Sequence, residues 1–119
     1  MVLLPDLYYR LGPYPPMNPR EVLADPELMS ALTKNVASLD RDRKISDTAA
    51  CIKFLISRPE VDGDRYGVTG YCMGGNLALT AAGAFPGQFA VVASFHGGNL
   101  VTDEPDSPHR FVKHIRCYK

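Results

Sequence analysis

The chain has 119 residues, enough for one domain or part of one, and its 13 acidic side chains balance its 13 basic ones. Without a basic run, nucleic acid and membrane surfaces are poor candidate partners, and no apolar stretch has the length of a transmembrane helix. Three cysteines, Cys51, Cys72 and Cys117, are odd in number and lack metal-ligand spacing. We therefore expect a reduced, cytoplasmic protein with no metal and no cofactor.

The N-terminal third of the chain predicts one strand, a stiff loop and a helix. Val2-Leu3-Leu4 is typical of a buried strand that Pro5 ends. Residues 11–20 hold four prolines, and a loop of this length and stiffness favours a pocket rim or lid. Asp25-Pro26-Glu27 then predicts a helix start, because Asp caps free N–H groups and Pro suits the first helical position.

The middle of the chain predicts a connector and a second helix. The charged run over residues 40–44 favours a solvated connector. The next helix is expected to begin at Ser46 and to end at Pro59, with Ile52 and Ile56 on its apolar stripe. Cys51 lies beside this stripe and is expected to pack as a small hydrophobic residue.

Two further strands and a helix follow. Residues 66–69 and 89–95 are typical of buried strands, and residues 76–84 of a helix between them. Strands that alternate with helices predict an α/β fold with a parallel sheet and right-handed crossovers. The carboxyl ends of such strands are a natural ligand site, and here they hold Asp6 to Arg10, Tyr71-Cys72 and His96-Gly97.

Gly70-Tyr71-Cys72-Met73-Gly74-Gly75 has the pattern of a nucleophile elbow in which cysteine replaces the usual serine. A sharp strand-to-helix turn would lift the Cys72 thiol above the sheet, and the flanking glycines would let strand and helix approach closely. The N–H of Met73 would point at a developing oxyanion. The helix N-terminus would favour the thiolate.

Two other interpretations of this motif remain open. One is a buried cysteine in a glycine-rich turn that only packs. The other is a dinucleotide-binding turn. This motif requires a further glycine at the position of Asn76 and an acidic residue about 20 residues further along the chain. The following strand ends instead in His96-Gly97-Gly98, and the first acidic residue after it is Asp103.

Three segments in this order resemble the dienelactone hydrolase family, the cysteine branch of the α/β-hydrolase fold. They are Leu4-Pro5-Asp6-Leu7-Tyr8-Tyr9-Arg10, the elbow, and Ser94-Phe95-His96-Gly97-Gly98. The resemblance covers about residues 2 to 112 and implies a Cys-His-Asp triad that hydrolyses an enol-lactone or related ester through an acyl-enzyme. It assigns the nucleophile to Cys72, an oxyanion donor to the Met73 N–H, and a substrate-carboxylate contact to Arg10. A guanidinium suits a carboxylate, although an ordinary loop arginine is the alternative.

The histidines do not complete the triad in the expected chain order of nucleophile, acid, histidine. His96 follows the strand after the elbow with no acid between, so we interpret it as a pocket-wall residue that contacts substrate. His109 and His114 follow Asp103 and Asp106, but the polar stretch around them is typical of a surface connection.

We therefore expect residues 1–119 to form a partial α/β-hydrolase domain that lacks N-terminal and C-terminal strands. The triad acid and histidine, and the strand between the Leu3 strand and the elbow strand, would lie outside this chain. The alternative is a non-catalytic fragment or interaction module whose exposed sheet edges bind a partner or cause self-association. The hydrolase interpretation implies a small lactone or ester as substrate.

Overall fold

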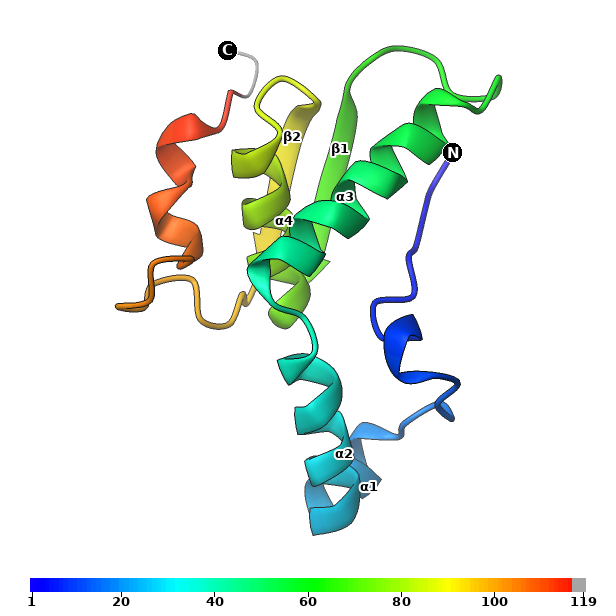
Figure 1. The fold of residues 1–119 in the computed structure, drawn as a ribbon, viewed down its shortest axis with the longest axis vertical. Helices are drawn as coiled ribbons and strands as arrows, with labels where there is room; N and C mark the ends of the chain where they lie inside the picture. Colours follow the sequence, from blue (N-terminus) through cyan, green and yellow to red (C-terminus); the bar gives the residue numbers. More distant parts are fainter. Residues whose placement is uncertain (117–119) are drawn as a thin grey trace. The chain divides into compact units, whose positions relative to one another are not determined.

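The computed structural model describes residues 1–116, so Cys117 lies outside the described part of the chain. The chain folds into two compact units (Figure 1). The smaller unit is Val2–Asp40, and the larger is Arg41–Lys119 together with Met1. None of the helices in residues 1–116 has both the length and the apolar character needed to cross a membrane.

The smaller unit contains a short 3-10 helix, η1 (Tyr9–Leu11), and two α-helices, α1 (Pro19–Ala24) and α2 (Pro26–Ala37). The predicted helix start is confirmed, because the Asp25 carboxylate accepts from the N–H groups of Glu27 at 2.8 Å and Leu28 at 3.3 Å. Helix α1 was not predicted and shortens the expected loop. Asn18 caps it by accepting from the Arg20 N–H at 3.0 Å.

The predicted strand at Val2–Leu4 is wrong. These residues have no regular structure, and the side chains of Val2 and Leu4 are 94% and 91% exposed. A strand needs a neighbour that satisfies its backbone N–H and C=O groups, and no strand in residues 1–116 pairs with this segment. The apolar composition of this segment therefore predicted a strand, but the described chain contains no neighbouring strand with which it could pair.

The larger unit begins with helix α3 (Arg41–Ile56), which corrects two predictions. The charged run from Arg41 to Lys44 is the first turn of this helix rather than a connector, and the helix starts before Ser46. Arg and Lys have good helix propensity, and Asp42 complements the dipole at the N-terminus. The helix ends at Ile56, shortly before Pro59, which agrees with the prediction that this proline prevents the helix from continuing.

Strand β1 (Tyr66–Tyr71) pairs in parallel with strand β2 (Phe89–Phe95). Helix α4 (Met73–Ala84) connects the two strands. This β-α-β arrangement confirms the predicted partial α/β fold. Helix α4 begins three residues earlier than predicted. The 3-10 helices η2 (Pro108–Arg110) and η3 (Val112–His114) follow β2 and contact α4.

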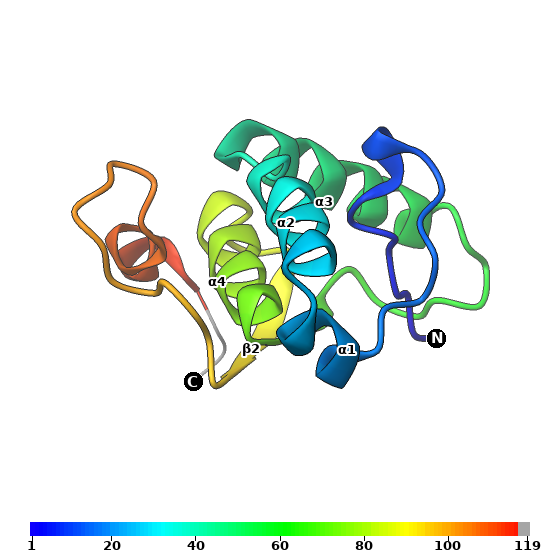
Figure 2. The same ribbon diagram turned by 90° about the horizontal axis from the view of Figure 1, so that it is seen from below.

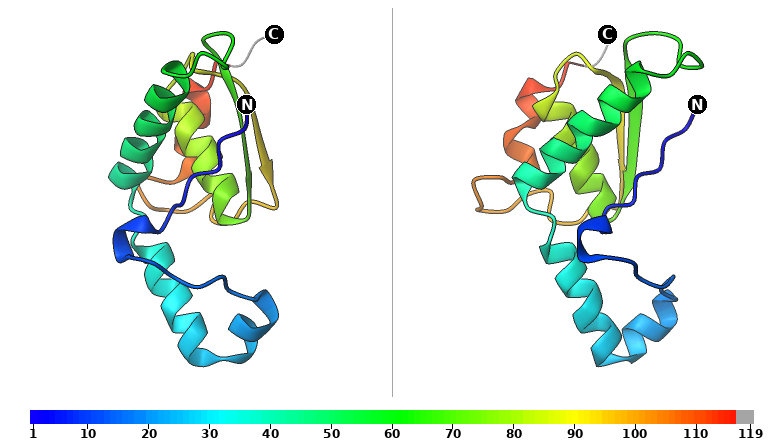
Figure 3. Two further views of the ribbon diagram at one scale, coloured as in Figure 1. Left: turned by 90° about the vertical axis from the view of Figure 1, so that its right-hand side faces the viewer. Right: turned by 45° about the vertical axis from the view of Figure 1, so that its right-hand side comes forward.

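Helices α3 and α4 both lie on one face of this two-stranded sheet (Figures 2 and 3). The core on that face is built from Ile52 of α3, Ala81 and Ala82 of α4, and Phe89 of β2. Within the larger unit, as far as residue 116, the opposite face of the sheet is open, so the prediction that both strands are buried is wrong. Its exposed side chains are Tyr71 (60%), Val91 (58%) and Phe95 (48%).

Candidate active site

Cys72 lies at the turn between β1 and α4 and has the strained backbone of a nucleophile elbow. Its φ is 52° and its ψ is −117°, a region that non-glycine residues rarely adopt and that costs about 1–3 kcal/mol. Backbone hydrogen bonds hold it there. The Cys72 N–H donates to the carbonyl oxygen of Phe95 at 3.1 Å, and the Cys72 carbonyl accepts from Gly75 at 3.0 Å and Gly98 at 3.1 Å. The side chain is exposed at this turn.

Two glycines of the motif are required by close packing. A Cβ on Gly70 would collide with the backbone carbonyl of Gly74, and a Cβ on Gly75 would collide with the Ser94 Oγ and lie 2.9 Å from the Gly97 Cα. This packing brings the first turn of α4 against the ends of both strands. The close approach that the glycines of the motif predicted is therefore confirmed.

Met73 is the first residue of α4. The first N–H groups of a helix lack intrahelical acceptors and point out of its N-terminus, where the partial positive charge of the dipole is greatest. The Met73 backbone therefore lies at the end of α4 that favours an anion, directly after Cys72.

His96 follows β2, so the parallel pairing brings it to the same end of the sheet as Cys72. Its backbone φ is 38°, and its ring centroid lies 6.1 Å from that of Tyr71. The Tyr71 ring stacks on Phe95 with centroids 5.0 Å apart and an interplanar angle of 14°. Aromatic side chains from the ends of both strands thus contact one another at the end of the sheet where Cys72 lies.

Sequence reasoning missed Asn76 and its partners. The Asn76 Oδ1 accepts from the Lys44 Nζ at 3.3 Å, and the Asn76 Nδ2 donates to the backbone carbonyl of Asn99 at 3.1 Å. Asn76 lies in the first turns of α4, which begins directly after Cys72. The available signal was therefore an amide in the first turns of the helix that follows Cys72.

His109 is engaged with a serine rather than with an acid. Its Nδ1 lies 2.7 Å from the Ser107 Oγ, which also accepts from the Thr102 N–H at 2.8 Å. Ser107 is 2% exposed, so this pair closes a structural turn after β2. Asp103 contributes its backbone carbonyl to Arg110, not its carboxylate to His109. His114 closes the 3-10 turn of η3 through its backbone N–H to Phe111.

Arg10 lies in η1 of the smaller unit. Its guanidinium carbon is 4.6 Å from the centroid of the Tyr9 ring, a cation–π geometry. The loop beside it is ordered by Asp6, whose Oδ1 accepts from the Tyr8 N–H at 3.0 Å and the Tyr14 hydroxyl at 2.9 Å. This hydrogen bond to Asp6 raises the pKa of Tyr14.

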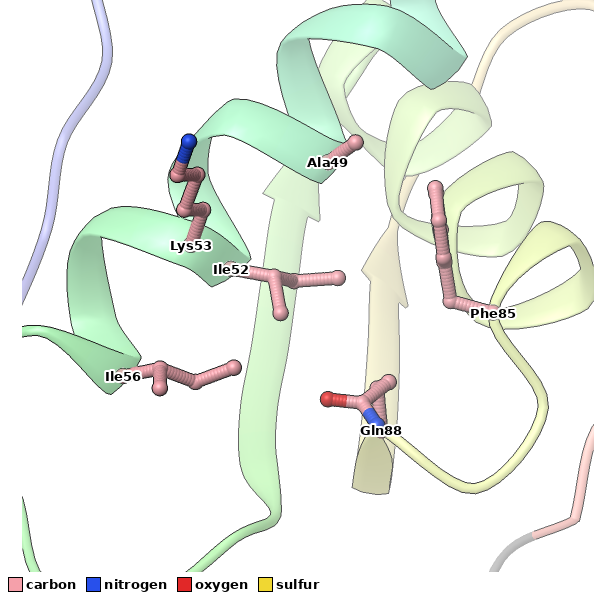
Figure 4. Close-up of a pocket in the computed structure, with 6 residues that line it drawn as sticks. All are labelled: Ala49, Ile52, Lys53, Ile56, Phe85 and Gln88. Carbon is pink, nitrogen blue, oxygen red and sulfur yellow. The ribbon is translucent and has the colours of Figure 1, made fainter.

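A cavity of about 310 Å³ opens beside α3 in the larger unit (Figure 4). It is lined by Ala49, Ile52, Lys53, Ile56, Phe85 and Gln88. Gln88 directly precedes β2, so this cavity lies at the amino end of the strands and contains none of the predicted site residues. In residues 1–116 no group of three or more His, Cys, Asp or Glu side chains could hold a metal ion.

Cys51 differs from Cys72 in environment. Its side chain is half-buried on α3, and burial raises the pKa of the Cys51 thiol, with a smaller contribution from the negative charge of Asp47. A thiol of this kind has little thiolate near neutral pH and suits packing better than catalysis.

Comparison with protein-family models matches residues 1–117 to the dienelactone hydrolase family. No curated protein and no solved structure matched this chain.

Proposed function

Because the chain belongs to the dienelactone hydrolase family, we propose that it represents a hydrolase of enol-lactone or carboxylic ester bonds in which Cys72 is the nucleophile. The observation that carries this proposal is the backbone of Cys72, at φ 52° between a strand and a helix N-terminus with an exposed thiol. Strained backbone of this kind is concentrated at active sites, and this supports a catalytic role for Cys72. Residues 1–119 would then be a partial α/β-hydrolase domain.

In a complete hydrolase that contains this segment, the reaction proceeds in two steps. The Cys72 thiolate attacks the acyl carbon, a C–S bond forms, the ester C–O bond breaks, and the leaving oxygen takes a proton. Water then attacks the thioester and releases the carboxylic acid and the thiol. The Met73 N–H stabilises the oxyanion in both steps, and a donor of this kind contributes about 2.7–4 kcal/mol to transition-state stabilisation.

Two further residues contact the substrate in this proposal. His96 forms a wall beside the elbow, and its position at the end of β2 supports that role. Arg10 binds a substrate carboxylate, which the Pro5-Asp6-Leu7-Tyr8 sequence before it supports through the family resemblance. Its guanidinium fork matches a carboxylate in geometry and charge.

Acylation of the full chain by a nitrophenyl ester tests this function. Peptide mapping by mass spectrometry should find the acyl group on the peptide that contains Cys72. The Cys72→Ala variant should lose the adduct, whereas the matched Cys51→Ala variant should retain it. An adduct that forms equally well in Cys72→Ala would remove Cys72 as the nucleophile.

A second candidate function is an interaction module that associates through its open sheet. The exposed face with Tyr71, Val91 and Phe95 supports it, because uncovered apolar sheet faces and strand edges favour pairing with another chain. Light scattering over a range of concentrations should then show self-association that Val91→Lys weakens. A mass that stays monomeric at every concentration would exclude self-association through this surface.

A further inference from the structure

Asn76 connects three segments of the larger unit around the elbow. Its side chain accepts from the Lys44 ammonium of α3 and donates to the Asn99 carbonyl in the segment after β2. An ammonium only donates and a carbonyl only accepts, so these two partners fix the orientation of the amide. Asn76 itself belongs to α4, which starts at the elbow.

The segment that Asn76 contacts is under backbone strain. His96 has a φ of 38°, which a side chain of its size rarely adopts, whereas asparagine tolerates the φ of 52° found at Asn99. A residue such as His96 keeps this conformation only where surrounding contacts impose it. Two backbone hydrogen bonds to Cys72 flank His96, one through the Phe95 carbonyl and one from the Gly98 N–H. The Asn76 amide adds a side-chain contact at Asn99.

We infer that Asn76 is a positioning residue that, oriented by Lys44, holds residues 96–99 against the elbow and thereby sets the place of His96 beside Cys72. This inference rests on the proposed function for its link to catalysis. The hydrogen-bond geometry that supports it does not depend on that function.

The Asn76→Asp variant separates this role from simple helix packing. A carboxylate keeps the Lys44 contact as an ion pair and suits the first turns of a helix, so it should preserve or raise the melting temperature. It cannot donate to the Asn99 carbonyl and would repel it. Asn76→Ala loses both contacts and serves as the second variant.

Hydrogen exchange of the Gly98 amide, which donates to the Cys72 carbonyl at 3.1 Å, is the direct measurement. Both variants should raise its exchange rate at least tenfold, while the Phe85 amide at the end of α4 keeps its rate. The His96 ring protons should also shift, because the ring moves relative to Tyr71. Unchanged Gly98 exchange in Asn76→Asp would overturn the inference.

Acylation of Cys72 by the nitrophenyl ester connects this role to chemistry. We expect at least a tenfold slower acylation in Asn76→Asp at an unchanged or higher melting temperature. Acylation at the wild-type rate would overturn the catalytic part of the inference. Failure of the wild-type chain to acylate would instead contradict the proposed function and leave the exchange result as the measure of positioning.

Discussion

A Cβ atom built on Gly70 would overlap the backbone carbonyl of Gly74, whereas a Cβ built on Gly74 would meet no heavy atom within 4 Å. The two glycines of one motif therefore differ in what they do. Gly70 allows the end of β1 to touch the first turn of α4, and that contact fixes how sharply the chain turns at Cys72. Gly74 only occupies a helical position with open space beside it.

This difference predicts opposite effects of the same substitution. Gly70→Ala should lower the free energy of unfolding by about 1–3 kcal/mol, because the added methyl group meets backbone that cannot rotate away. Gly74→Ala, the matched control, should leave stability unchanged or raise it by up to about 1 kcal/mol, because alanine favours the helix. Urea unfolding monitored by circular dichroism measures both. Equal losses would contradict the packing assigned to Gly70.

Cys72 should react with iodoacetamide faster than Cys51 at neutral pH. Cys72 is exposed, whereas Cys51 is half-buried and its pKa is raised by burial and then by Asp47, so less of it is thiolate at a given pH. The labelling rate of Cys51 should therefore keep rising with pH beyond the ordinary thiol range. Peptide mapping over a pH series measures both rates.

Asp47→Asn is the control for this prediction. It should lower the Cys51 pKa and speed its labelling without changing Cys72, although burial will keep Cys51 the slower of the two. Faster labelling of Cys51 than of Cys72 in the unmodified chain would contradict the prediction that the elbow exposes a reactive thiol.

The chain should show no sustained turnover of enol-lactones or nitrophenyl esters, only a slow burst of acylation. No histidine in residues 1–116 hydrogen-bonds the Cys72 thiol. His109 contacts the buried Ser107 instead, so it does not serve Cys72 as a base. In a related triad system, loss of the triad costs about 10⁶ in turnover. Stopped-flow absorbance separates burst from steady state. Steady turnover abolished by His96→Ala would show that His96 is the base.

Arg10→Ala should impair reaction with a carboxylated ester tenfold or more and leave a neutral ester of similar size nearly unaffected. Charged hydrogen bonds contribute about 1.5–3 kcal/mol, and only the anionic substrate would lose one. The measurement is the second-order rate constant of Cys72 acylation with each ester in both proteins, or kcat/KM in a hydrolase that contains this segment. Equal losses on both esters would mean that Arg10 has a structural role.

Local signals in the sequence were sufficient for the elbow and its neighbours. Glycine spacing around Cys72 predicted the strand-turn-helix unit, the run over residues 89–95 predicted β2 with its observed bounds, and Asp25-Pro26 predicted the start of α2. These features depend on backbone conformation and helix capping within a few residues. Both are determined by the residue types at neighbouring positions in the sequence. The parallel pairing followed because a helix connects the two strands.

Contacts between distant residues were decided only by the tertiary structure. Val2–Leu4 is apolar enough for a strand but has no ladder partner in residues 1–116, and the strands β1 and β2 are apolar but covered on one face only within that range. The bonds from Asn76 to Lys44, 32 residues away, and to Asn99, 23 residues away, leave no periodic signal in the sequence. The sequence shows that a polar side chain is present, but the packing of helices and strands determines its hydrogen-bond partner.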